Sequence, residues 1–152
     1  MNGHIYEIVT EKEAAFSFVL NDVIEQAGHE FYYCKEIKPK DIKERVDDLM
    51  KMMNKYGAET GFDGGVPYFI MSDTVRCNYF KQRFERFTRL ASRVKCVADF
   101  VSASKMGEIA NCITNQLGDF VYRNALENID DWFRNAENNT KYYVGNVIYI
   151  HY

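Results

Sequence analysis

The chain has 152 residues but only one tryptophan, two prolines and three histidines, and none of its four cysteines belongs to a C-x-x-C pair. No stretch approaches the roughly 18 consecutive apolar residues that a membrane-spanning helix requires. The N-terminus has no basic segment followed by an apolar run. We therefore expect a cytoplasmic protein with no membrane partner. In that compartment disulfides are rare, so we interpret the four cysteines as buried free thiols.

Motifs that would identify a reaction are also missing. Neither G-x-x-x-x-G-K-[ST] nor G-x-G-x-x-G occurs, so the common nucleotide-binding fingerprints are absent. Ser102 and Lys105 satisfy S-x-x-K, but the companion motifs are missing and we expect Ser102 or Ser104 to cap a helix. His4 and His151 belong to terminal strands that are candidates for neighbours, yet their spacing supports no metal site. We expect no catalytic residue, no metal and no cofactor.

What is present is typical of a folded domain. Hydrophobic residues make up 47% of the chain, aromatic residues 15% and charged residues 27%. A length of 152 residues suits one globular domain over 1–152. Predicted strands alternate with predicted helices, which favours an α/β fold, with a mixed α+β fold as the alternative. We expect a mixed sheet of about four to five strands packed with about five helices.

Short β-branched and aromatic runs predict the strands. These runs cover 5–9, 31–37, 66–71 and 142–152. The segment 96–101 is predicted as a fourth short strand or as a buried connection. In the last strand, Val144, Ile148 and Ile150 are predicted to share one face. Pro67 disfavours a central position in the sheet for its end of the strand, because proline lacks the N–H that a ladder needs.

Apolar residues at spacings of three and four predict the helices. The first helix is expected to begin at a capping box, Thr10 to Glu13, and to end at Gly28. The second is expected to begin at Pro39 and to end at Gly57. Asp73 is expected to cap a third helix over 74–95. Helical patterns also cover 104–121 and 126–133.

The third predicted helix has an unusual charge. Between residues 74 and 96 there are seven basic residues and one acid, Glu85, which gives +6 within a chain of −3, so the remainder carries −9. Its apolar residues, Cys77, Phe80, Phe84, Phe87, Ala91 and Val94, are expected to face the core. The neighbouring stripe is the candidate partner-binding surface: Arg76, Tyr79, Lys81, Arg83, Arg86, Arg89 and Arg93.

Arginine offers a planar set of donors that suits carboxylate and phosphate. The basic stripe therefore predicts contact with an acidic protein surface, or direct binding of DNA or RNA. The alternative is a solvated helix face that is neutralised within the chain, for which carboxylates are available at Asp47, Asp48, Asp130, Asp131 and Glu137. The acidic composition disfavours a dedicated nucleic-acid binder.

The leading functional hypothesis is a small non-enzymatic binding protein that regulates or inhibits a larger protein or protein–nucleic-acid machine. The many residues with AT-rich codons indicate a low-GC bacterium, phage or plasmid, so counter-defence by a phage or mobile element is one version. A further hypothesis is an enzyme with a site at the glycine-rich loop 57–65, around Asp63, Gly64 and Gly65. A homodimer through the tyrosine-rich C-terminal strand is also expected as an alternative.

Overall fold

A computed structural model describes residues 2–17, 20–27, 31–114 and 118–152. Over these residues it has one sheet of seven strands, six α-helices and one 3-10 helix, so the predicted mixed α/β class is confirmed with more strands than expected. The strands are β1 (Asn2–Val9), β2 (Tyr33–Glu36), β3 (Thr60–Asp63), β4 (Val66–Met71), β5 (Phe120–Tyr122), β6 (Leu126–Asn128) and β7 (Thr140–His151). The helices are η1 (Lys12–Ala14), α1 (Leu20–Ala27), α2 (Pro39–Lys55), α3 (Asp73–Ala91), α4 (Val97–Phe100), α5 (Ala103–Ile113) and α6 (Ile129–Asn135).

The C-terminal strand β7 organises the sheet, whose order is β3-β4-β7-β1-β5-β6. It pairs with β1 along one side, and with β4 and then β2 along the other, all antiparallel. The pairing of β1 with β5 is parallel. Among the strands that the structure describes, β4 and β2 leave only the short stretch 144–147 of this edge of β7 unpaired, so a homodimer through the strand would have to use it. Self-association itself stays a prediction.

A β-bulge interrupts β7 near its middle. Tyr6 and Ile8 of β1 pair with Val147 and Val144, so one extra residue of β7 lies opposite Glu7. Val144 consequently packs in a different core cluster from Ile148 and Ile150. Our prediction that these three share one face was wrong, because a bulge reverses the alternation beyond it.

Each face of the sheet carries a core. On one face α2, α6 and the first turn of α3 pack over the sheet, with Phe69, Met53 and Phe133 fully buried. On the other face a smaller cluster joins Val23 of α1 and Phe31 to Ile5, Ile148 and Ile150. Both faces of β7 are therefore covered, as expected for a strand with apolar residues on both faces.

Local signals located α2 and its neighbours correctly. Pro39 occupies the first turn of α2, where its missing N–H costs nothing. Val46, Leu49 and Met53 form the buried stripe, and Gly57 ends the segment at φ 95°. Pro67 pairs with Phe62 of β3, whereas the pairing of β4 with β7 begins one residue later at Tyr68.

Two predicted helix starts were wrong. The Thr10–Glu13 capping box does not form. The N-cap of η1 is Glu11, which makes no side-chain capping hydrogen bond. Phe16, at φ 64°, has a left-handed backbone conformation that breaks any helix between η1 and α1. The Thr10 hydroxyl instead accepts a hydrogen bond from Arg123 at 3.0 Å. For α3 the cap is Ser72 rather than Asp73, since Ser72 Oγ accepts from the Val75 amide at 3.3 Å. Gly28, the predicted stop, lies outside the described residues.

Two longer segments also differ from prediction. The segment 96–101 contains the helical turn α4, and Val97, Phe100 and Val101 are exposed rather than buried. The helix predicted over 104–121 ends at Ile113, and Phe120–Tyr122 form β5 between β1 and β6. Pairing with two strands outweighs the helical spacing of such a short segment. All four cysteines are free, as predicted, but only Cys112 is buried.

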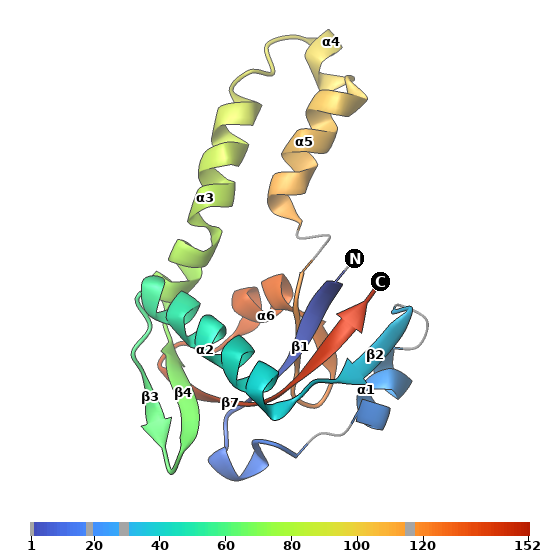
Figure 1. Cartoon of the computed structure of the whole chain (residues 1–152). Helices are drawn as coiled ribbons and strands as arrows, with labels where there is room; N and C mark the ends of the chain where they lie inside the picture. Colours follow the sequence, from blue (N-terminus) through green and yellow to red (C-terminus); the bar gives the residue numbers. More distant parts are fainter. Residues whose placement is uncertain (1, 18–19, 28–30, 115–117) are drawn as a thin grey trace.

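The helices α3 and α5 form a hairpin that projects from the body of the protein, with α4 at its far end (Figure 1). We call residues 73–113 the projecting hairpin. The first half of α3, through Tyr79 and Phe80, still packs against the core, whereas the rest of the hairpin consists of α3 and α5 packed on one another. Val75 and Cys112 are the residues buried in these two helices. Among the described residues no helix is long and apolar enough to cross a membrane.

Candidate protein-binding hairpin

The base of the projecting hairpin is fixed to α6 through a buried carboxylate. Asp130, in the first turn of α6, accepts from two guanidinium nitrogens of Arg83 at 2.5 and 2.9 Å and from the Tyr79 hydroxyl at 2.6 Å. Burial alone would raise the pKa of the Asp130 carboxyl, but these hydrogen bonds outweigh it and the pKa lies below the ordinary aspartate value. Asp130 is therefore a charged group that joins α3 to α6.

Aromatic stacking supports the same junction. The Tyr79 ring stacks on Phe133 of α6 at 3.7 Å between centroids, and the Arg83 guanidinium lies 4.8 Å from the centroid of Phe80. Burial, followed by the hydrogen bond to Asp130, raises the pKa of the Tyr79 hydroxyl, which stays protonated. The junction thus combines a charged pair with stacked rings.

Arg76 makes a second attachment, at the other end of α6. Its Nε donates to the Phe133 carbonyl at 2.8 Å, and another guanidinium nitrogen donates to the Ala136 carbonyl. Asp73 and Asn138 bind the remaining nitrogen at 2.5 and 3.0 Å. Carbonyls at a helix C-terminus lack intrahelical donors, so Arg76 supplies them and complements the dipole of α6.

The structure therefore divides the seven predicted partner-binding residues into two groups. Arg76, Tyr79 and Arg83 are engaged inside the chain, as the internal-neutralisation alternative anticipated for Asp130. The other four are exposed, form no ion pair with any described residue, and lie along the projecting part: Lys81, Arg86, Arg89 and Arg93. We call these four the free cations.

The far end of the hairpin adds an apolar surface that the sequence did not reveal. Val97, Phe100 and Val101 are 77, 67 and 69% exposed. The turn is held by Asp99, which pairs with Lys105 and accepts from the Lys95 amide at 2.9 Å. The hydrogen bond from Lys105, then that from the Lys95 amide, lowers the pKa of Asp99 to about 2. We call these three exposed side chains the apolar tip.

The apolar seam of α3 does not face a core as predicted. Phe84 is 64% exposed and Cys77 is exposed, while Phe80, Phe84 and Phe87 border a hollow of about 200 Å³ beside Cys112 and Ile113 of α5. The large rings come from α3 alone, and the smaller side chains of α5 do not enclose them. The hairpin consequently exposes apolar and cationic side chains together.

The glycine-rich loop 57–65, the other predicted site, has its acidic side chain Asp63 bound within the chain. Gly64 and Gly65, at φ 57° and 83°, form the turn between β3 and β4. The Asp63 carboxylate accepts from the Tyr143 hydroxyl at 2.8 Å and pairs with Lys12 at 3.4 Å. The Tyr143 bond, together with Lys12, lowers the pKa of Asp63. Its carboxylate is thus committed to holding the turn.

An apolar pocket of about 480 Å³ lies next to this turn and includes Gly65 but not Asp63. Its charged lining residues are Lys43 and Asp47, which pair with each other at 2.8 Å.

Ser102 caps α5 as predicted, accepting from the Lys105 amide. His4 and His151 lie on the paired strands β1 and β7, and the described residues contain no group of three or more His, Cys, Asp and Glu side chains placed to hold a metal.

Comparison with known proteins adds no assignment, since no family model, curated protein or solved structure matches the chain.

Proposed function

We propose that this chain is a non-enzymatic binding protein whose projecting hairpin docks on an acidic surface of a larger protein or protein–nucleic-acid assembly and thereby regulates or inhibits it. The observation that carries the proposal is the segregation of the free cations and the apolar tip on one projection. The attachment of the hairpin at its base supports this role, because the largely buried Arg83–Asp130 pair joins α3 to α6 of the body.

The chemistry of the tip favours a protein partner over nucleic acid. A phosphate backbone offers charge to the free cations but nothing apolar to Val97, Phe100 and Val101. Protein interfaces combine an apolar centre with a polar rim and are enriched in arginine relative to the rest of the surface. The body of the protein is acidic, which opposes approach to a nucleic acid outside the hairpin.

The free cations favour an acidic partner, because they form no ion pair with any described residue of the chain itself. Exposed arginines contribute little to the stability of the folded chain. Opposite charges on a partner would increase the association rate and orient the two proteins in the complex. If the many residues of types with AT-rich codons reflect a phage or mobile element, the assembly is a host defence or nucleic-acid enzyme that this chain inhibits.

The test compares two variants with equal loss of charge. In the hairpin variant, Lys81, Arg86, Arg89 and Arg93 are changed to glutamine. In the control variant, four exposed lysines of α2 and its flank are changed instead: Lys38, Lys40, Lys51 and Lys55. Wild-type protein is used to capture partners from extracts of the source cells, and each purified partner is titrated with all three proteins at several salt concentrations.

We expect the hairpin variant to lose at least tenfold in affinity while the control stays close to wild type. Equal affinity for all three proteins would contradict the proposal. Labelled duplex and single-stranded DNA and RNA are titrated in parallel. Salt-dependent binding to these, lost in the hairpin variant, would instead establish a nucleic-acid-binding protein.

A further inference from the structure

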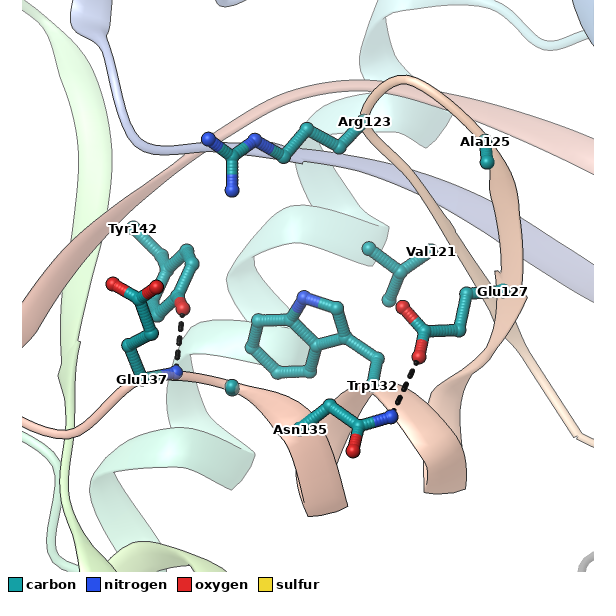
Figure 2. A pocket seen from close by; sticks show the side chains of 9 residues that line it. Val121, Arg123, Ala125, Glu127, Trp132, Asn135, Glu137 and Tyr142 are labelled. Atoms are coloured by element: carbon teal, nitrogen blue, oxygen red, sulfur yellow. Dashed lines mark hydrogen bonds between the residues drawn. The ribbon is translucent and has the colours of Figure 1, made fainter.

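A second site lies on the other side of α6 from the hairpin junction. It is a pocket of about 150 Å³ between the β5–β6 strands, α6 and the start of β7 (Figure 2). Val121, Trp132 and Tyr142 are buried side chains that line it, and Arg123, Glu127 and Glu137 add charge. A volume well below the roughly 300–1,000 Å³ of drug-sized pockets restricts it to a small ligand.

The sheet geometry explains why these side chains converge. Val121 pairs with Glu127 across β5 and β6, so both side chains stand on the same face. Arg123 comes directly after β5, in the bend before β6, and also lines the pocket. Trp132 comes from α6, which begins directly after β6. The Tyr142 hydroxyl accepts from the Glu137 amide at 2.9 Å and fixes the segment between α6 and β7.

Two donors of the pocket, the Arg123 guanidinium and the Trp132 indole N–H, have no anionic acceptor among the described residues. Arg123 donates to the Thr10 hydroxyl at 3.0 Å but pairs with no described carboxylate, although two carboxylates line the same pocket. The indole nitrogen of Trp132 lies on the side of the ring that faces Arg123 (Figure 2), and no described group accepts from it. An anionic oxygen between them would satisfy both donors.

The two carboxylates of the pocket, Glu127 and Glu137, lie beside the Trp132 indole and away from Arg123 (Figure 2). Glu127 is half-buried, and Asn135 donates to its carboxylate at 3.2 Å, which fixes its orientation toward the pocket (Figure 2). It forms no ion pair with a described residue. Glu137 is exposed and lies across the pocket from Glu127 (Figure 2). Positive and negative groups are therefore held apart around one small aromatic-walled volume.

We propose that this pocket binds a small zwitterion of the α-amino acid class, with its carboxylate at Arg123 and the Trp132 N–H and its ammonium at Glu127. The ligand supplies each separated charge with its counterpart in one molecule, and the indole covers its apolar atoms. Nothing in this proposal depends on the function of the projecting hairpin.

Trp132 is the only tryptophan of the chain, so its fluorescence and its single indole N–H resonance report on the pocket directly. The protein is titrated with glycine, L-alanine and L-serine, and separately with acetate and methylamine, which carry one charge each. We expect saturable changes in both signals with at least one amino acid, and much weaker changes with the single-charge compounds.

Variants then assign the two ends of the ligand. Arg123→Gln and Glu127→Gln should each weaken binding by about tenfold or more, since each removes a charge-assisted hydrogen bond. Arg93→Gln, a change of the same type on the hairpin, should leave binding unchanged. The proposal is overturned if no amino acid moves either signal, if acetate or methylamine binds as well as the amino acids, or if Arg123→Gln binds like wild type.

Discussion

The Asp130 carboxylate of α6 accepts two hydrogen bonds from the Arg83 guanidinium of α3, and this pair joins the projecting hairpin to the sheet-bearing body. Asp130 is buried, and Arg83 is three-quarters buried by α6 and its own helix. Removing one partner of such a pair leaves the other without compensation, which costs more than the pair itself contributes.

We therefore expect Asp130→Asn to lower the free energy of unfolding by about 2–4 kcal/mol. The neighbouring Asp131→Asn is the control, because Asp131 pairs with Arg134 at the exposed surface and should cost less than about 1 kcal/mol. Urea unfolding at neutral pH measures both. Similar losses for the two variants would show that the buried pair does not anchor the hairpin.

The same carboxylate should make stability depend on pH. Its pKa in the folded protein lies below the unfolded value of about 3.9, so the stabilisation is fully present above that value and is lost as the pH falls through the folded pKa. The difference in unfolding free energy between wild type and Asp130→Asn should be largest near pH 7 and should shrink below about pH 4. Asp63 and Asp99 titrate in both proteins, so the comparison isolates Asp130. A difference that is constant from pH 7 to pH 3 would contradict this assignment.

How far the sequence predicts this structure depends on the range of the interactions involved. Pro39, the stripe from Val46 to Met53 and Gly57 locate α2 because its start, face and end are local features. The strand over 120–122 was predicted as helix, since its identity depends on pairing with β1, more than 100 residues earlier in the chain.

The candidate surface shows the same limit. Arg76 and Arg83 follow the same helical pattern as Arg86 and Arg89, and nothing local separates the two pairs. Their roles differ because α6 packs against the first half of α3 only. The pocket at Trp132 was not predicted for a related reason: Arg123 and Glu127 converge only once 120–128 forms two strands. The aromatic and β-branched triplet at 120–122 was the available signal.

The apolar tip provides a test of whether its residues serve folding or contact. Changing Val97, Phe100 and Val101 together to serine removes apolar surface that the folded chain leaves in water. We expect the free energy of unfolding to change by less than about 0.5 kcal/mol per residue. Thermal and urea unfolding measure this, and a loss of several kcal/mol would mean that the tip packs within the chain.

Two glycines with opposite surroundings give the last prediction. A Cβ on Gly145, in the bulge of β7, would lie 2.7 Å from the Glu7 carboxylate and 2.7 Å from the backbone nitrogen of Phe16. The backbone of the loop must then shift, so Gly145→Ala should destabilise by about 1–3 kcal/mol.

Gly107 lies within α5, and a Cβ there would meet nothing within 4 Å. Gly107→Ala should stabilise the protein by about 0.5–1 kcal/mol, because alanine is the better helix former. Unfolding in urea distinguishes the two signs. If Gly145→Ala were neutral, the close approach of β7 to Glu7 and the loop after η1 would not hold in solution; if Gly107→Ala were destabilising, the exposed face of α5 would be in contact with another surface.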